Sequence, residues 1–150
     1  MNSTRMVRLA AAFAALAFTG SAYAAEPAND LSIAFLPIEA TTAHAGTEAG
    51  GLSPSVATRL ASKDATIRIA QGETKAGEKP ADTAARLNVR FLFTGTMGGE
   101  GAFIAAIEVI DAKTGAVILK SSFFSDEDNI PTLPGEIASG LYSALKAVKL

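Results

Sequence analysis

The sequence predicts an α+β fold, an α/β sandwich in which helices cover one face of a mixed sheet. Strand-like and helix-like patterns alternate in the order βαβαβββα. Three consecutive strand patterns are joined by turns of hairpin length, and the carboxyl-terminal segment has a single apolar helical face. Strands joined by a hairpin pair antiparallel, whereas strands separated by a helix pair in parallel. We therefore expect an antiparallel three-stranded meander inside a mixed sheet.

The first 24 residues have the features of a secretory signal peptide. Arg5 and Arg8 precede the apolar run at residues 9–18, and Ala22 and Ala24 place small side chains at positions −3 and −1 of a cleavage site. As a helix the run would rise only ~15 Å, about half of a hydrocarbon core. We expect cleavage after Ala24, a periplasmic location and no stable membrane anchor afterwards.

Composition limits what the exported chain can do. The full chain has 150 residues, with 13 basic and 15 acidic side chains. Cleavage after Ala24 leaves 126 residues and a net charge of −4, since two of the basic residues lie in the signal. No cluster of Lys and Arg is present, which argues against nucleic-acid binding. Without cysteine, disulfides and thiolate metal sites are excluded. Residues 25–30 form a polar leader, and residues 31–150 are long enough for one domain.

The first half of the domain is expected to contain two strands and a helix. Residues 31–38 form an apolar strand that Pro37 interrupts, and residues 39–51 form a long loop. Ser53 and Pro54 are typical of an N-cap followed by the first helical position, so the helix is predicted from there to about Lys63. Residues 65–70 alternate like a half-buried strand, and residues 71–79 form a charged loop.

The second half is expected to contain a helix, the meander and a terminal helix. Pro80 begins a helix that Asn88 ends in the left-handed conformation. The turn at residues 111–115 ends in Gly115, which suits a positive φ. A polar crossing at residues 126–134 leads to the terminal helix, whose apolar residues recur at helical spacing. The three meander strands are expected at residues 89–97, 102–110 and 116–124.

Several segments taken in order resemble the TolB amino-terminal-like domain, which is related to the CsgG and FlgT envelope modules. These segments are IAFLPIEA, GGLSPSVATRLASKDATIRIA, DTAARLNVRFLFTGTM, EVIDAKTGAVIL and EIASGLYSAL, which together span about residues 31–148. Their most specific features are a strand with Thr94-Gly95 and a hairpin with Asp111 and Thr114-Gly115. The resemblance implies an α/β sandwich that acts as a protein-binding or assembly module of the bacterial envelope, without catalytic residues. We expect a free-standing version that lacks the TolB propeller.

His44 is the only imidazole and lies near Glu39 and Glu48 in the sequence. Three ligands in one loop could form a weak metal site, but their spacing is not diagnostic. We interpret His44 as a solvated loop residue. No serine has a histidine beside it in the sequence that would act as its base.

Three further motifs have structural interpretations. Asp111 is best explained as a cap of the following turn rather than as a catalytic carboxylate. The acidic run at residues 126–128 lacks the additional oxygen donors of a calcium loop, and we interpret it as a solvated linker. The glycine-rich turn at residues 98–101 joins two strands, and no helix follows it to bind phosphate. The sequence therefore predicts no catalytic, cofactor-binding or metal-binding residue.

The meander has a second apolar face, which is the candidate partner surface. If alternate residues from Phe103 to Val109 face the helices, the residues between them point to the other side. An uncovered apolar face of this kind is typical of a contact surface. The alternative is that residues 39–51 and 71–80 fold over it. The predicted partner face consists of Ile104, Ala106, Ile110, Ile118 and Phe124.

These observations favour an exported, non-catalytic protein-binding or adaptor module of the cell envelope. Its expected partner is another envelope protein or a second copy of the chain, with no nucleic acid and no cofactor. A small-molecule or lipid-binding periplasmic protein is the alternative, and it requires an apolar pocket with a few convergent polar atoms. A metal- or histidine-dependent enzyme is a third class, and it would depend on His44.

Overall fold

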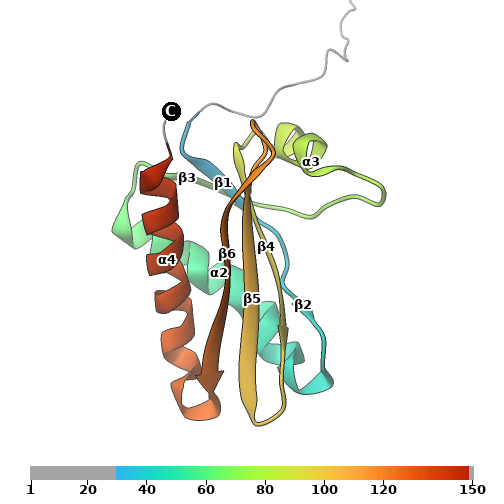
Figure 1. Ribbon diagram of the computed structural model, residues 1–150, viewed down its shortest axis with the longest axis vertical. Helices are drawn as coiled ribbons and strands as arrows, with labels where there is room; N and C mark the ends of the chain where they lie inside the picture. Colours follow the sequence, from blue (N-terminus) through green and yellow to red (C-terminus); the bar gives the residue numbers. More distant parts are fainter. Residues whose placement is uncertain (1–29, 149–150) are drawn as a thin grey trace, which may run out of the picture.

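The computed structural model describes residues 30–148. The predicted fold class and element order are confirmed within this range (Figure 1). The predicted signal peptide and most of the leader lie outside the described residues. The elements are β1 (Ser32–Phe35), β2 (Glu39–Ala40), the 3₁₀ helix η2 (Ala43–Ala45), α2 (Gly46–Lys63), β3 (Arg68–Gln71), α3 (Pro80–Leu87), β4 (Phe91–Gly98), β5 (Ala102–Asp111), β6 (Ala116–Asp126), the 3₁₀ helix η3 (Glu127–Thr132) and α4 (Leu133–Ala147).

The sheet is mixed, as the alternation of helix-linked and hairpin-linked strands predicts. Its strand order is β3-β1-β4-β5-β6, and the short strand β2 also pairs with β4. The helix-linked strands β1, β3 and β4 pair in parallel, and the hairpins pair β4 with β5 and β5 with β6 antiparallel. Gly115 has φ +79° after the turn at Asp111, as expected from its position. Because β6 is the last strand in this order and pairs only with β5, it is one edge of the sheet.

Helices cover both faces of the sheet, which corrects the prediction that all of them share one face. Helices α2 and α4 pack on the main core, together with Ile33 and Phe35 of β1. The neighbouring residues Ala34 and Leu36 point the opposite way and pack against Ala84 of α3. Since side chains alternate along a strand, β1, whose four residues are all buried, requires a cover on each side. Figure 1 shows α4 beside the long strands and α3 near the start of β4.

Helix α2 begins at Gly46, seven residues before the predicted N-cap, so the expected loop at residues 39–51 is wrong. Ala45 and Ala49 are buried like Leu52, Val56 and Leu60, so the apolar face of the helix extends more than a turn before Ser53. Ser53 is buried and its hydroxyl donates to the carbonyl of Leu36 at 2.7 Å, rather than capping the helix. Pro54 lies inside the helix, and both Pro54 and Gly50, four residues before it, are exposed. Proline has no N–H to donate to the carbonyl of Gly50.

The remaining differences concern element ends. Strand β3 begins at Arg68, three residues later than expected, and the polar crossing after β6 contains η3. The side chain of Asp126 accepts a hydrogen bond from the backbone N–H of Asn129 at 2.9 Å, so it caps η3 as it begins. The helix α3 and its left-handed end at Asn88, with φ 56°, are as predicted.

Candidate functional site

The candidate site is the face of β5 and β6 that points away from α2 and α4, which we call the outer face. Residues that alternate along β5 divide as predicted, with Phe103, Ala105, Ile107 and Val109 buried toward the helices. On the outer face, Ile104 is 43% exposed and Phe124 is 69% exposed. The exposed residues of one strand lie opposite those of the other, because Ile104 and Phe124 are cross-strand partners.

Four of the five predicted partner-face residues lie on this outer face, and Ile118 does not. Val109 pairs with Leu119 and Ile110 pairs with Val117, so Ile118 is the extra residue of a β-bulge. Its side chain packs against the main core instead. Beyond the bulge Val117 takes the outer position, where it is 49% exposed. The strict alternation assumed from the sequence is broken there by one residue, which reverses the faces of the residues before it.

The centre of the outer face is polar. Glu108 and Lys120 are direct cross-strand partners, and Thr94 lies opposite Glu108 on the other side. Together with Thr96, Ala106 and Ser122 they line a shallow hollow of about 410 Å³. The outer face thus has apolar side chains at its two ends and charged and hydroxyl groups between them.

The segment at residues 71–79 reaches only the margin of this face. Glu73 and Thr74 line a hollow with Thr94 and Thr96, which belong to β4. Residues 46–51 belong to α2, which packs on the opposite side of the sheet. Among the described residues, the two segments expected as an alternative cover therefore leave β5 and β6 open.

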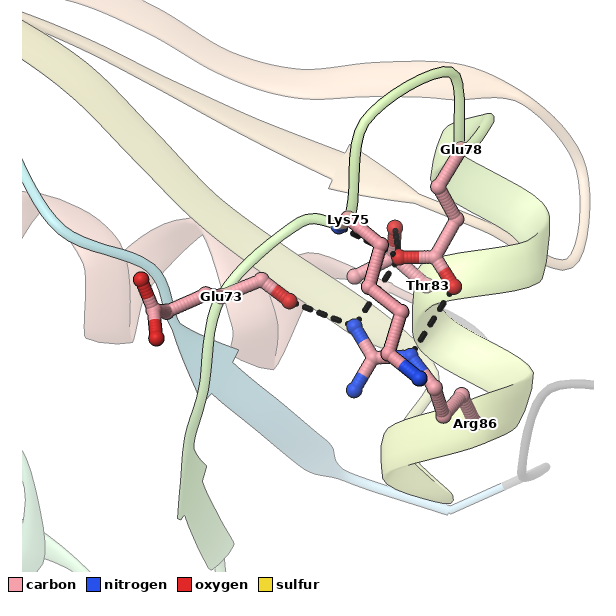
Figure 2. Close-up of polar contacts among 5 residues, drawn as sticks. All are labelled: Glu73, Lys75, Glu78, Thr83 and Arg86. Carbon is pink, nitrogen blue, oxygen red and sulfur yellow. Dashed lines mark hydrogen bonds and ion pairs between the residues drawn. The ribbon is translucent and has the colours of Figure 1, made fainter.

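The position of this segment is fixed by a polar network around Glu78 (Figure 2). One carboxylate oxygen of Glu78 accepts from the Lys75 backbone N–H, the Thr83 hydroxyl and Nη2 of Arg86, each at 2.9 Å. The other accepts from Nε of Arg86 at 2.9 Å, and Nη2 of Arg86 also donates to the carbonyl of Glu73. The hydrogen bonds from Arg86 and Lys75 lower the pKa of Glu78 from 4.5 to about 2. This network ties the segment to α3, and the sequence alone does not predict it.

In the structure His44 contacts residues that are distant from it in the sequence. Its ring stacks on Phe103 at 5.0 Å between centroids, and Nε2 lies 3.2 Å from a carboxylate oxygen of Glu127. No group of three histidine and acidic side chains within residues 30–148 is arranged to hold a metal ion. His44 therefore joins η2 to η3, a contact that requires the fold to bring distant segments together.

Asp111 caps the turn that follows it, as predicted, and has a second role. Its Oδ1 accepts from the backbone N–H of Lys113 at 3.0 Å. The same carboxylate forms two hydrogen bonds with Arg90, whose side chain is also buried. Burial raises the pKa of Asp111, but the hydrogen bonds from Arg90 and Lys113 outweigh it and hold the pKa below its usual range.

A second hollow of about 420 Å³ lies between α2 and the start of α4. Leu52, Met97 and Leu133 contribute apolar surface, and Arg59 contributes a cation. Most of the residues that line this hollow are exposed or half-buried, so it is a groove at the surface. No helix within residues 30–148 combines the length and apolar character needed to cross a membrane.

Comparisons with known proteins identify the fold. No protein-family model and no curated protein sequence matches the chain. Among solved structures, TolB from Acinetobacter baumannii matches with a TM-score of 0.54 and 17% identity, over 85% of this chain and 31% of that one. The PelC dodecamer from Paraburkholderia phytofirmans matches with a TM-score of 0.53 and 17% identity, over 83% of this chain and 95% of that one.

These two matches differ in how much of each neighbour is covered. The chain spans about a third of the length of the TolB structure but nearly the whole of the PelC chain. It shares the fold of one part of TolB and of nearly all of a PelC chain, which agrees with the resemblance of its sequence segments to the TolB amino-terminal-like domain.

Proposed function

We propose that this protein is an exported, non-catalytic module of the bacterial envelope that acts by binding another protein chain through the outer face of β5 and β6. The observation that carries the proposal is the exposure of Ile104, Val117 and Phe124 on one sheet face that no described segment covers. Exposing large apolar side chains on adjacent strands costs free energy in water unless a partner buries them.

The similar folds support the same function. The TolB likeness is confined to one part of that protein, and the PelC likeness extends over a chain whose structure is a dodecamer. A fold that serves both as a part of a larger protein and as an assembled chain is suited to making protein contacts. The signal-like sequence of the first 24 residues supports export.

The proposal of a non-catalytic role rests on the site chemistry. The titratable side chains with shifted pKa values are paired with neighbours in structural networks, as Glu78 is with Arg86 and Asp111 is with Arg90. Neither pair lines the outer face. Glu108 and Lys120 do lie there, but they are arranged beside hydroxyl groups and not beside a nucleophile with its base.

Site-specific photo-crosslinking in bacterial cells tests this function. A photoreactive phenylalanine analogue replaces Phe124, and a matched analogue replaces Lys63, which is exposed on α2 away from the outer face. We expect defined protein adducts at position 124, few at position 63, and a periplasmic product that begins at Ala25. Equal adducts at both positions, or a product retained in the cytoplasm with residues 1–24 intact, would refute the proposal.

A further inference from the structure

We propose that the partner of the outer face is the outer face of a second copy. The two copies are related by a two-fold axis that lies midway between their sheets, parallel to the strands and over the line between β5 and β6. This inference rests on the proposed function and specifies its partner.

The register gives four cross-strand pairs on the outer face, which follow one another along β5 and β6. Each pair combines residues of complementary kind: two apolar side chains, two small ones, two opposite charges and again two apolar ones. The pairs are Ile104 with Phe124, Ala106 with Ser122, Glu108 with Lys120 and Ile110 with Val117.

A two-fold axis between the strands places β5 of one copy over β6 of the other. In such an isologous contact, each residue meets the cross-strand partner of its own chain, supplied by the second copy. Ile104 then faces Phe124, Glu108 faces Lys120 and Val117 faces Ile110. Any other register along the strands would place a charge against an apolar side chain, so the pattern favours this alignment.

The two central charged side chains form no ion pair within the described part of the chain. Glu108 and Lys120 are adjacent across the strands, yet neither forms an ion pair with a described residue. In the two-fold arrangement Glu108 of each copy lies opposite Lys120 of the other, which gives two equivalent ion pairs. Charges arranged in this way fix the register of an interface and disfavour other partners.

The rest of the molecule leaves room for this contact. Helix α3 packs over β1 and the start of β4, and the segment at residues 71–79 borders β4. Since β6 is an edge strand, the sheet of the second copy extends past it into open space. Each α3 then lies beyond the edge of the opposite sheet. The two sheets approach at the usual ~10 Å separation of packed sheets.

A charge-swap series tests the arrangement. The purified protein, Glu108→Lys, Lys120→Glu and the double variant are compared by sedimentation velocity, with Lys63→Glu as a charge-matched control on α2. We expect dimers for the unchanged protein and the control, dissociation constants about tenfold higher for each single variant, and recovery in the double variant. Phe124→Thr changes a side chain that is 69% exposed, and it is expected to weaken the dimer without lowering the thermal stability of the monomer, measured at concentrations where both proteins are monomeric.

Three results would overturn the inference: a monomer at all accessible concentrations, a dimer that neither single variant weakens, or a double variant no stronger than the singles. Its failure is distinct from that of the proposed function. A monomeric chain that crosslinks to another envelope protein through position 124 excludes the dimer and supports the broader function. A dimer formed by a chain that is never exported supports the dimer and refutes the envelope role.

Discussion

Arg90 and Asp111 form a buried two-point ion pair that ties the start of β4 to the end of β5. Nε of Arg90 donates to Oδ1 of Asp111 at 3.0 Å, and Nη2 donates to Oδ2 at 2.8 Å. Both side chains are 4% exposed, and the guanidinium also lies 5.1 Å from the centre of the Phe91 ring. Within the described residues Nη1 of Arg90 is buried without a hydrogen-bond partner, so this pair provides most of the compensation for burying the cation.

Replacing Arg90 with leucine is expected to destabilise the protein strongly. The change leaves the carboxylate of Asp111 buried and without its cation, and breaking a buried pair in this way typically costs about 3–5 kcal/mol. Urea denaturation followed by circular dichroism measures the loss as a lower midpoint at an unchanged slope.

Arg68→Leu is the matched control for this prediction. Arg68 also pairs with an aspartate, at 3.4 Å from Asp30, but both side chains are about half exposed. Exposed pairs contribute about 0–1 kcal/mol, so the control is expected to lose little. Equal losses in the two variants would mean that burial does not determine the importance of the Arg90 pair.

The order of elements could be predicted because it depends on local patterns. The turn at Asp111 and Gly115, and the left-handed end at Asn88, are determined by residue types that favour those conformations. The ion pair could not be predicted in the same way. Arg90 and Asp111 are 21 residues apart, and nothing in the spacing indicates that the two strand ends meet. Only the pairing of Phe91 with Asp111 in the sheet brings them together.

The positions of most residues on the outer face could be predicted for the same reason. Alternation along β5 is regular, so Ile104, Ala106 and Ile110 were placed on the correct face. The assignment of Ile118 failed because a β-bulge has no clear signature in a run of apolar residues. Its neighbours Val117 and Leu119 are equally apolar, and the change of face becomes visible only in the register.

The segment at residues 71–79 is expected to loosen in acid. The pKa of Glu78 is lowered to about 2 from 4.5, so the charged form is bound more tightly by its neighbours in the folded protein. A lowered carboxyl pKa stabilises the fold above the unfolded value, and this contribution is lost as the pH falls from about 4.5 to about 2. Hydrogen exchange of the Lys75 amide, corrected for its intrinsic rate, measures the effect.

Glu78→Gln supplies the control for the acid response. The amide keeps the shape of the side chain but does not ionise, so exchange at Lys75 is expected to be fast and independent of pH after the same correction. Unchanged protection between the two ends of this pH range in the unmodified protein would contradict the role of Glu78.

Two glycines are expected to respond in opposite ways to replacement by alanine. A Cβ at Gly95 would lie 2.5 Å from the backbone carbonyl oxygen of Ala106 and 2.9 Å from Cδ1 of Ile107, so Gly95→Ala must shift the sheet. We expect it to cost about 1–3 kcal/mol, as overpacking does. A Cβ at Gly50, which lies within α2, meets nothing within 4 Å. Gly50→Ala is therefore expected to raise the free energy of unfolding by about 0.5–1 kcal/mol. Melting temperatures that change in the same direction would contradict this account.

The side chain of Ser53 is expected to stabilise the fold by joining α2 to the end of β1, and not by beginning the helix. Its hydroxyl donates to the carbonyl of Leu36 at 2.7 Å, and Ser53 is only 5% exposed. Ser53→Ala leaves that carbonyl without this donor, which typically costs about 1–3 kcal/mol. Ser55→Ala, at an exposed position two residues further along α2, is expected to change stability little.

Amide hydrogen exchange separates the two possible starts of α2, at Gly46 and at Ser53. If Ser53 were the N-cap, Ser53→Ala would fray a helix that began there. Residues 46–52 would then exchange their amide hydrogens rapidly in both the unmodified protein and Ser53→Ala. Because α2 begins at Gly46, the amides of Leu52 and Ser53 are already within the helix. They are expected to be protected from hydrogen exchange in the unmodified protein. Rapid exchange of these amides would place the helix start at Ser53 after all.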